Sequence, residues 1–287
     1  MIEGQIIKIV SNQYTVNSNG KEYLCNSRGR FRNDKITPMV GDYVVFDPNN
    51  NYILEIKERK NMLIRPVVSN IDQGLILTSV KLPDFDPVLL DKLIVMMELN
   101  NVKPIICISK MDLLNDLEKE KINKIFDYYK SIGYLVFTNN DLDDIKKIFK
   151  DKTTVFTGQT GAGKSTLINK LNPDINFETG EISIALGRGK HTTRHIELIE
   201  LFDGKILDSP GFSALDFNNI DRDKIRDAFI EFRNYPCKYK DCNHINEDDC
   251  NVKDAVSKGL ILESRYLSYK KIINSRWLYE KSISIVF

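Results

Sequence analysis

The stretch GQTGAGKSTL, residues 158–167, decides the fold. The phosphate-loop pattern G-x-x-x-x-G-K-[ST] is matched by Gly158, Gly163, Lys164 and Ser165, between the strand-like TTVFTG and the helix-like STLINKL. Glycines let the loop backbone wrap a phosphate chain at a helix N-terminus. We predict that Lys164 neutralises the β- and γ-phosphates and that Ser165 binds Mg²⁺. The predicted nucleotide-binding residues here are Gly158, Gln159, Thr160, Gly161, Ala162, Gly163, Lys164, Ser165 and Thr166.

Outward from this loop, strand-like and helix-like segments alternate. Working back from TTVFTG, the chain reads YLVFT, a charged helix ending near Gly133, PIICIS, a helix capped by Asp86 with Pro87 at its first position, and IDQGLILTSV. HIELIELFDGKILDSPG predicts a hairpin that turns at Asp203-Gly204. This pattern indicates an open α/β sheet with helices on both faces.

A second nucleotide segment, SKMD at residues 109–112, precedes the phosphate loop by about fifty residues. The carboxylate of Asp112 can accept hydrogen bonds from both the N1–H and the amine of guanine, which adenine does not offer. We predict guanine binding by Ser109, Lys110, Met111 and Asp112, with Ser109 standing where the usual motif has Asn. Parallel strands deliver their ends to one sheet edge whatever their order in the chain. The sequence therefore predicts a circularly permuted P-loop GTPase domain.

Further candidates follow the phosphate loop. In DSPG, Asp208 can hold Mg²⁺ and the Gly211 N–H can sense the γ-phosphate. The glycine-rich basic loop LGRGKHTTRH, residues 186–195, favours a switch in which Thr192 or Thr193 completes the Mg²⁺ shell; a plain linker is the alternative. Phe212 follows DSPG, and a phenyl ring cannot orient water. The missing catalytic group would come from His191 or from a partner.

The first sixty-odd residues contain five or so short strands, with an Asn19-Gly20 hairpin turn, and predict an oligonucleotide-binding (OB) barrel. The loop RGRFRNDK, residues 28–35, places Arg28, Arg30 and Arg32 around Phe31. Such a mixture can bind phosphates and stack on a base. The alternative is a solvated basic loop with one anchoring aromatic residue.

Beyond residue 218 the sequence pattern predicts helices. This part of the chain contains the motif C-x4-C-x-H-x5-C, formed by Cys237, Cys242, His244 and Cys250. Three thiolates and one imidazole form a closed tetrahedral set, typical of structural zinc. Such a metal folds a loop that has too few apolar residues to fold alone.

Composition limits the possible functions. Net charge is +1 and 42% of residues are hydrophobic, which excludes a disordered, tail-like nucleic-acid binder. The termini are mildly basic around an acidic middle, which suits a polyanionic partner. There is no signal-peptide pattern and no apolar run long enough to span a membrane. We expect a cytoplasmic monomer with no membrane contact.

Taken together, GQTGAGKSTL, LGRGKHTTRHIELI, DSPGF, VGDYV and the cysteine spacing resemble the ribosome small-subunit-dependent GTPase A (RsgA) family over essentially the whole chain. The resemblance implies three domains: an all-β OB barrel (1–66), a permuted GTPase (67–218) and a mostly helical zinc-binding domain (219–287). It also implies GTP and GDP as ligands, binding to rRNA of the small (30S) ribosomal subunit, subunit-stimulated hydrolysis late in maturation and release of assembly factors. His191 is then the catalytic histidine, alongside Lys164, Thr192, Thr193 and Gly211.

Two other functions fit parts of the sequence. A P-loop kinase would prefer ATP and need a substrate pocket, and Asp112 with no recognisable lid speaks against it. A zinc-containing RNA-binding scaffold with weak nucleotide turnover would show no stimulation of GTP turnover by small subunits.

Overall fold

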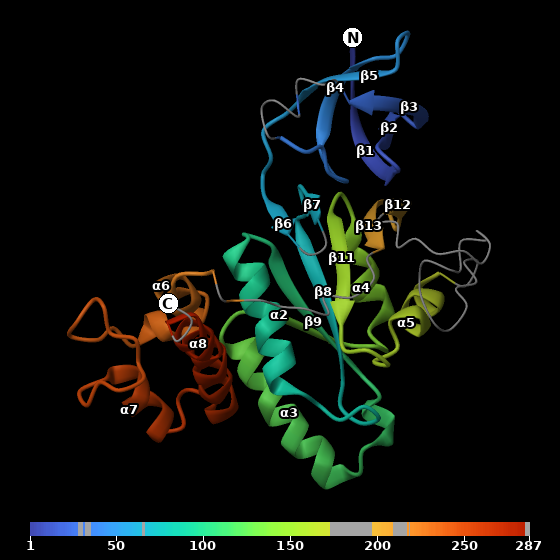
Figure 1. The fold of residues 1–287 in the computed structure, drawn as a ribbon. Helices are drawn as coiled ribbons and strands as arrows, with labels where there is room; N and C mark the ends of the chain where they lie inside the picture. The colour runs from blue at the N-terminus through green and yellow to red at the C-terminus, as the bar shows by residue number, and fades with distance from the viewer. Residues whose placement is uncertain are drawn as a thin grey trace. The chain divides into compact units, whose positions relative to one another are not determined.

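The computed structural model describes residues 1–27, 31, 36–64, 67–172, 197–208, 217 and 219–284, with only the backbone described at 64, 208 and 275–284. The chain divides into two compact units, whose elements Figure 1 labels. The first unit comprises Met1–Leu75, Asn139–Thr157 and Gly163–Phe212. The second comprises Ile76–Thr138, Gly158–Ala162 and Ser213–Phe287.

The first unit begins with the expected small barrel. Its strands are β1 (Ile2–Val10), β2 (Gln13–Ser18), β3 (Lys21–Ser27), β4 (Tyr43–Asp47) and β5 (Tyr52–Ile56). They are ordered β1-β2-β3-β5-β4, and pairing between β1 and β4 closes the barrel. Asn19 (φ 52°) and Gly20 (φ 80°) both adopt the left-handed conformation that a tight hairpin turn needs, as their sequence predicted.

Alternating side chains of these strands fill the barrel. Ile6, Val16, Val44, Phe46 and Ile53 are fully buried there. Phe31 also packs in this core and is only 8% exposed. A ring held there is not free to stack on a base, so the anchoring interpretation fits Phe31 better than the stacking one. Arg28, Arg30 and Arg32 lie outside the described residues.

The remainder of the first unit is α/β. It contains β6 (Met62–Ile64), which pairs with β7 (Val67–Ser69), and the first residues of β8 (Gln73–Ser79). It continues with α4 (Leu142–Phe149), β11 (Thr153–Gly158), α5 (Lys164–Leu171), β12 (Glu197–Leu201) and β13 (Gly204–Asp208). Strand β13 lies parallel to β11 and antiparallel to β12, so the predicted hairpin over residues 197–208 is present.

Strand β12 also joins the barrel. It pairs antiparallel with β1 at Glu197 and Lys8, and the Lys8 Nζ lies 3.0 Å from the Glu197 carboxylate. Lys205 of β13 donates to the Gln5 side chain of β1 at 2.5 Å. The barrel is thus hydrogen-bonded to the hairpin that carries Asp208.

The second unit contains strands in the order β10-β9-β8. After β8 come α2 (Pro87–Leu99), β9 (Lys103–Ser109), the short 3-10 helix η1 (Met111–Leu113), α3 (Asp116–Ser131) and β10 (Leu135–Thr138). All seven residues of β8 are buried, as is usual for a parallel strand covered on both faces. Asp86 accepts from the backbone N–H groups of Val88 and Leu89, so the predicted cap is confirmed.

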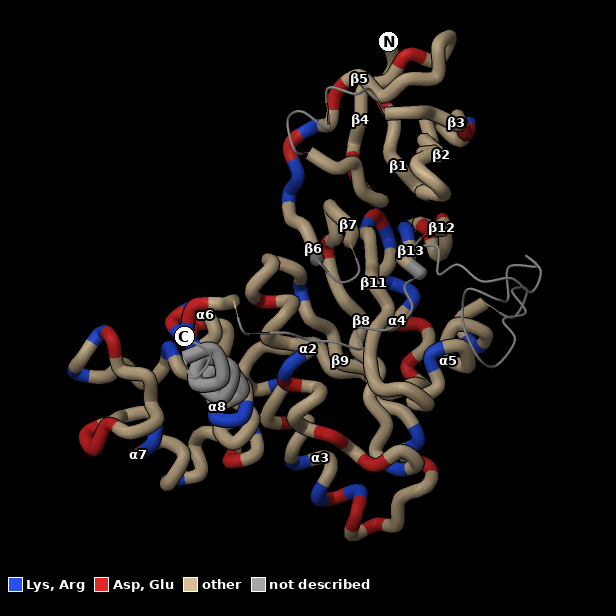
Figure 2. Tube along the Cα trace, viewed as in Figure 1, with Lys and Arg blue, Asp and Glu red and all other residues tan. Residues whose placement is uncertain are grey.

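Helix α3 is solvated along most of its length. Asn115 and Glu118 form a reciprocal capping box at its start. Only Phe126 and Tyr129 of this helix are buried, and Figure 2 shows basic and acidic residues interspersed along it. The helix covers the sheet with a narrow apolar stripe and presents charge to water.

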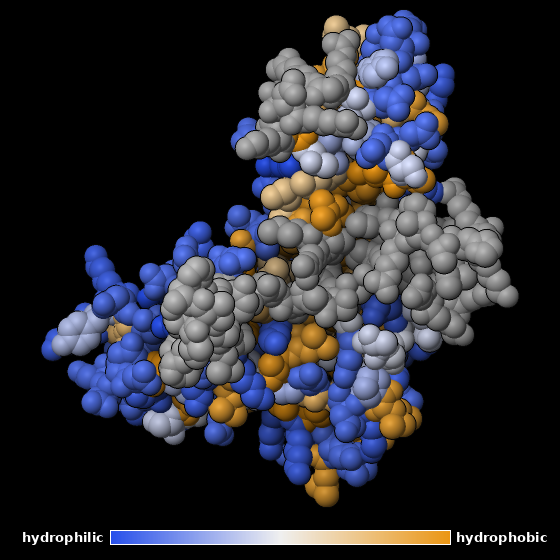
Figure 3. Space-filling view, viewed as in Figure 1, coloured by the Kyte–Doolittle hydropathy of each residue, from blue (hydrophilic) through white to orange (hydrophobic). Residues whose placement is uncertain are grey.

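The C-terminal part of the second unit is helical, as the sequence predicted. It consists of α6 (Arg222–Asp227), the 3-10 helix η3 (Ile230–Asn234), α7 (Asn251–Ser257) and α8 (Glu263–Ser284). Helix α8 runs beside α2 (Figure 1). The face drawn in Figure 3 is mostly hydrophilic over α7 and its flanking loops. Apolar side chains turn inward, with Phe229, Val252, Tyr269 and Ile272 fully buried in one cluster.

A buried ion network ties these helices to α2. The Arg265 guanidinium donates twice to Glu231, at 2.7 and 3.1 Å, and once to Asp91 at 2.7 Å. The Tyr129 hydroxyl donates to the same Asp91 oxygen at 2.6 Å. Burial alone would lower the pKa of Arg265, but Glu231 and Asp91 more than offset this and raise it well above its ordinary value. Arg265 is therefore a permanent cation inside the fold.

Among the described residues, no helix is both long and apolar enough to cross a membrane.

Candidate functional site

The phosphate loop leaves β11 at a point of close backbone approach. At Gly158 φ is 133°, and a Cβ there would lie 2.0 Å from the Leu77 carbonyl oxygen of β8. Only glycine fits this position. The Gln159 N–H donates to that same carbonyl at 3.1 Å, which fixes the start of the loop against β8.

The loop then turns into α5. Gly161 (φ 77°) and Gly163 (φ 94°) take left-handed conformations, and Gly163 is the N-cap of the helix. Lys164 and Ser165 are its first two residues, where backbone N–H groups have no partner within the helix. An anion is favoured at such a helix terminus.

Burial lowers the pKa of Lys164 below its ordinary value. Burial disfavours the charged form of an ammonium group, so a bound polyphosphate would stabilise it. Ser165 is half-buried beside it and Thr166 is exposed. These side chains fit a magnesium-bound phosphate chain, in which the hydroxyl is a Mg²⁺ ligand.

The base-reading segment meets the phosphate loop in the second unit. The Ser109 hydroxyl, at the end of β9, donates to the Ala162 carbonyl at 2.7 Å and lies 3.3 Å from the Thr78 carbonyl. The Lys110 ammonium donates to the Gly161 carbonyl at 2.9 Å and also to the Leu82 carbonyl. The two pairs of residues are separated by 53 and 51 positions in the sequence and are nevertheless in direct contact. They meet at the sheet edge where the strand pattern placed them.

Asp112 and Met111 lie on η1, just beyond this contact. Asp112 is exposed, and within the described part of the chain its carboxylate has no recorded hydrogen bond or ion pair. A free carboxylate at this edge can accept the two N–H groups of a guanine. Met111 is half-buried.

The other candidates are only partly described. Asp208 is the last residue of β13, where its backbone pairs with Glu197, and its side chain is not described. His191, Thr192, Thr193 and Gly211 lie outside the described residues. Their roles remain predictions.

The four predicted metal ligands do converge. One donor atom from each of Cys237, Cys242, His244 and Cys250 lies within 4.8 Å of all the others. The His244 Nδ1 is 3.5, 3.3 and 3.3 Å from the three sulfurs, and the Cys237 and Cys250 sulfurs are 3.7 Å apart. Tetrahedral ligands held about 2.3 Å (S) and about 2.0 Å (N) from an ion would be about 3.5–3.8 Å apart. The donors therefore fit one metal ion.

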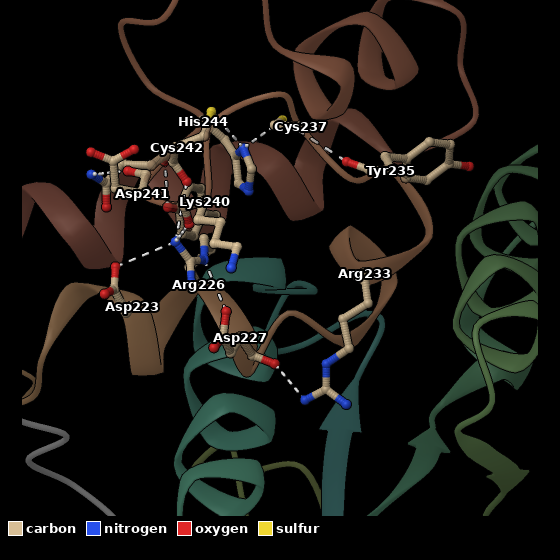
Figure 4. Close-up of polar contacts among 12 residues, drawn as sticks. Asp223, Arg226, Asp227, Arg233, Tyr235, Cys237, Lys240, Asp241, Cys242 and His244 are labelled. Carbon is tan, nitrogen blue, oxygen red and sulfur yellow. Dashed lines mark hydrogen bonds and ion pairs between the residues drawn. The ribbon is translucent and has the colours of Figure 1, made fainter.

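Electrostatics support a cation at this position. Burial raises the pKa of Cys242 to about 12 and also raises that of Cys250, because buried thiolates are unfavourable without a compensating charge. Burial lowers the pKa of His244, which favours the neutral imidazole that a metal requires. The Arg226 guanidinium donates to the Lys240 and Cys242 carbonyls and forms ion pairs with Asp223 and Asp227 (Figure 4).

Two family models match the chain. The RsgA N-terminal domain matches residues 3–53 and the RsgA GTPase matches residues 56–218. A protein of Oceanobacillus iheyensis named small ribosomal subunit biogenesis GTPase RsgA 2 is 47% identical over 283 residues, covering 95% of this chain and 97% of that protein. A protein of the same name from Listeria monocytogenes is 47% identical over 281 residues, with the same coverage. The chain belongs to the RsgA GTPase family.

As a member of the RsgA GTPase family, the chain is a GTP-hydrolysing enzyme, which leaves the small-molecule kinase alternative without support. The crystal structure of YloQ, a circularly permuted GTPase, superposes with a TM-score of 0.79 at 38% identity, covering 96% of this chain and 94% of YloQ. That of YjeQ from Thermotoga maritima gives 0.83 at 31% identity, covering 96% and 98%. The predicted permuted GTPase fold is confirmed.

The sequence did not point to the residues of α8 that support the loop carrying the candidate metal ligands. The Tyr266 and Tyr269 hydroxyls donate to the His244 and Asn243 carbonyls at 2.7 and 2.5 Å. Their spacing of three residues is that of any buried helix face, so it carries no signal of a metal site. The Glu247 carboxylate, which accepts from the N–H groups of Asn243 and Ile245, is likewise indistinguishable from a surface acid in the sequence.

Proposed function

We propose that this chain is a GTPase of small ribosomal subunit biogenesis that hydrolyses GTP when it docks on the 30S subunit. The observation that carries the proposal is the direct contact of Ser109 and Lys110 with Ala162 and Gly161, which brings the predicted guanine-reading segment against the predicted phosphate loop. Relatives named small ribosomal subunit biogenesis GTPase, similar along nearly the whole chain, support the ribosomal partner.

In this proposal, Asp112 selects guanine while residues 158–166 hold the phosphates of GTP or GDP. Lys164 neutralises the terminal phosphates, whose negative charge stabilises the ammonium that burial disfavours. Ser165 and Asp208 would hold Mg²⁺, which would neutralise charge on the phosphates when bound. Thr192 or Thr193 would complete the Mg²⁺ shell in the GTP state, and the Gly211 N–H would sense the γ-phosphate.

His191 is the proposed catalytic residue, because Phe212 stands where water-orienting glutamine is common. Docking on the subunit supplies or orders the groups needed to attack the γ-phosphate, hydrolysis relaxes the switch segments, and the protein dissociates and helps to release assembly factors. We assign this step to late maturation.

The ends of the chain contribute the grip on rRNA. Arg28, Arg30 and Arg32 would neutralise rRNA phosphates, while Phe31 packs in the barrel core. One structural Zn²⁺ on the Cys₃His cluster holds the C-terminal loop, since closed thiolate-rich tetrahedral sites are typical of structural zinc. We retain the division into domains 1–66, 67–218 and 219–287, and propose that the protein acts as a cytoplasmic monomer, where subunits mature.

The test is GTP turnover with and without purified small subunits, with large subunits as the matched control. Small subunits should raise turnover on the order of 10²-fold, the contribution of one positioned acid–base group. His191→Ala should lose most of that stimulation while retaining nucleotide binding. Equal turnover with both subunits would reject docking-stimulated hydrolysis and favour an RNA-binding scaffold with weak turnover.

A further inference from the structure

The first residue of β12 joins the barrel to the hairpin that ends in Asp208. Among the described residues, β12 pairs with β1 only at Glu197 and Lys8, whereas it pairs with β13 along its whole length. In the hairpin, Glu197 lies directly opposite Asp208, the candidate Mg²⁺ ligand. The predicted switch loop, residues 186–195, ends two positions before Glu197 in the sequence. The switch loop and DSPG therefore flank a single backbone pair, Glu197 with Asp208.

A part-buried ion pair holds Glu197 from the barrel side. The Lys8 ammonium donates to the Glu197 carboxylate at 3.0 Å, and the two side chains are 14% and 25% exposed. Charges shielded from water to this extent attract one another more strongly than an exposed pair does. Because Glu197 and Asp208 are paired through their backbones, a displacement of Glu197 by the barrel also displaces the last residue of β13.

A second contact joins β1 to the hairpin. Lys205 of β13 donates to the Gln5 side chain, and the buried Gln5 amide itself donates to the Gly41 carbonyl at 3.1 Å. Gly41 belongs to VGDYV, residues 40–44, and a Cβ there would lie 2.0 Å from the Ser69 carbonyl oxygen of β7. VGDYV is therefore packed closely against β7 and is connected to the hairpin through Gln5.

The barrel core links these contacts to the predicted RNA-binding loop. Phe31, within residues 28–35, packs in the core to which Ile6 of β1 also belongs. Ile6 lies between Gln5 and Lys8 on that strand. A ligand that displaces the loop can therefore displace β1 through the core. Packed side chains and hydrogen bonds of this kind carry energetic coupling between distant sites.

We propose that Lys8 and Glu197 are positioning residues for GTP hydrolysis, which couple occupancy of the barrel to the Asp208 end of the β12–β13 hairpin. Lys205 and Gln5 complete this connection, which we call the barrel–hairpin clamp. The inference rests on the proposed function for the identity of the barrel's ligand, the rRNA of the small subunit. Coupling between two sites is reciprocal, so replacing GDP with a GTP analogue must also act on the barrel.

The first experiment measures this reciprocal effect without ribosomes. Hydrogen exchange of the full chain is compared in Mg²⁺ with GDP and in Mg²⁺ with a non-hydrolysable GTP analogue. In the wild type, the amides of β1 should exchange about 5-fold more slowly with the GTP analogue, the low end of typical allosteric coupling. Lys8→Glu should abolish this difference. The double variant Lys8→Glu/Glu197→Lys restores opposite charges and should recover it.

Two further variants separate the clamp from a general loss of stability. Glu197→Gln removes the charge without placing like charges together, and it should also reduce the difference between the nucleotides. Glu3→Lys is the matched control, because it reverses one charge of the β1 pair with Lys57, and neither residue belongs to the hairpin. It should keep the wild-type difference. Equal exchange of β1 with both nucleotides in the wild type, or an undiminished difference in Lys8→Glu, would overturn the proposal.

GTP turnover with purified small subunits tests the coupling in the other direction. The ratio of turnover with and without subunits should fall about 5-fold or more in Lys8→Glu and return in the double variant. A wild-type ratio in Lys8→Glu would overturn the clamp. If small subunits did not stimulate the wild type, the proposed function would fail, whereas a nucleotide-dependent difference in β1 exchange that requires Lys8 would still support the clamp.

Discussion

Replacing Arg265 with methionine should strongly destabilise the C-terminal helices. Arg265 and Asp91 are fully buried and Glu231 is 2% exposed, so the substitution leaves two carboxylates inside the fold without their cation. Breaking one side of a buried ion pair costs about 3–5 kcal/mol. The guanidinium also lies 4.5 Å from the Phe229 ring centroid, a contact that methionine replaces only in part.

Hydrogen exchange measured by mass spectrometry reports this cost locally, which suits a chain with more than one unit. Protection factors in α2, η3 and α8 should fall on the order of 10²- to 10³-fold. The matched control is Lys258→Met, which removes a pair with Asp254 at 2.6 Å whose side chains are 62% and 56% exposed. An exposed pair of this kind contributes at most about 0.5 kcal/mol.

The effect should also depend on pH with a defined sign. Burial raises the pKa of Asp91 above its ordinary value and Arg265 opposes this effect, so loss of Arg265 raises the folded-state pKa of Asp91 further. Stability is then fullest below the unfolded value near about pH 4 and is lost as pH rises toward the folded one. The deficit of Arg265→Met should therefore be larger at pH 8 than at pH 5. A loss no larger than that of Lys258→Met, or a deficit independent of pH, would refute the assignment of the network as a stabilising buried charge cluster.

Four further changes have defined outcomes. Gly158→Ala places a Cβ 2.0 Å from the Leu77 carbonyl and should weaken GDP binding about 10-fold or more in a fluorescence titration; near-normal affinity would contradict the close approach. Asp112→Asn should weaken GDP about 10²-fold or more and shift preference toward xanthosine nucleotides in competition assays, whereas unchanged selectivity would exclude Asp112 as the base reader. Because burial lowers the pKa of Lys164, GDP affinity should fall as pH rises toward that lowered value, and Lys164→Met should abolish this slope in titrations from pH 7 to about 9.5. Stripping metal with a chelator should raise hydrogen exchange in residues 237–257 and added Zn²⁺ should reverse it, while Cys242→Ser should need more Zn²⁺ for the same recovery; exchange indifferent to chelation would argue against a structural metal.

Local chemistry explains which parts of the fold the sequence could predict. The turn at Asn19-Gly20 and the cap at Asp86 depend on neighbours within four residues, so their signals are complete in a short window. The meeting of SKMD with the phosphate loop was also predictable, because parallel strands must end at one edge of a sheet.

Long-range packing accounts for what the sequence could not give. Phe31 sits in a basic loop, and only the closed barrel shows that its ring belongs to the core. Arg265 binds Glu231 and Asp91, which lie 34 and 174 residues away in the sequence. From the sequence alone, three charged residues in helices are expected to lie on the surface. The pairing of β1 with β12 is equally hidden, because an edge strand carries no mark of its partner.

The reversed order of the two nucleotide segments also has a consequence for synthesis. Translation delivers Asp112 first, on η1 directly after β9, when β8 and α2 have already been made, and the Ala162 carbonyl that accepts from Ser109 emerges only about fifty residues later. A nascent chain interrupted between them possesses a base reader with no grip on phosphate. The chain can therefore bind the nucleotide only after synthesis has passed the middle of the chain. The ligand then stabilises the nascent protein late in its folding and does not direct the early steps.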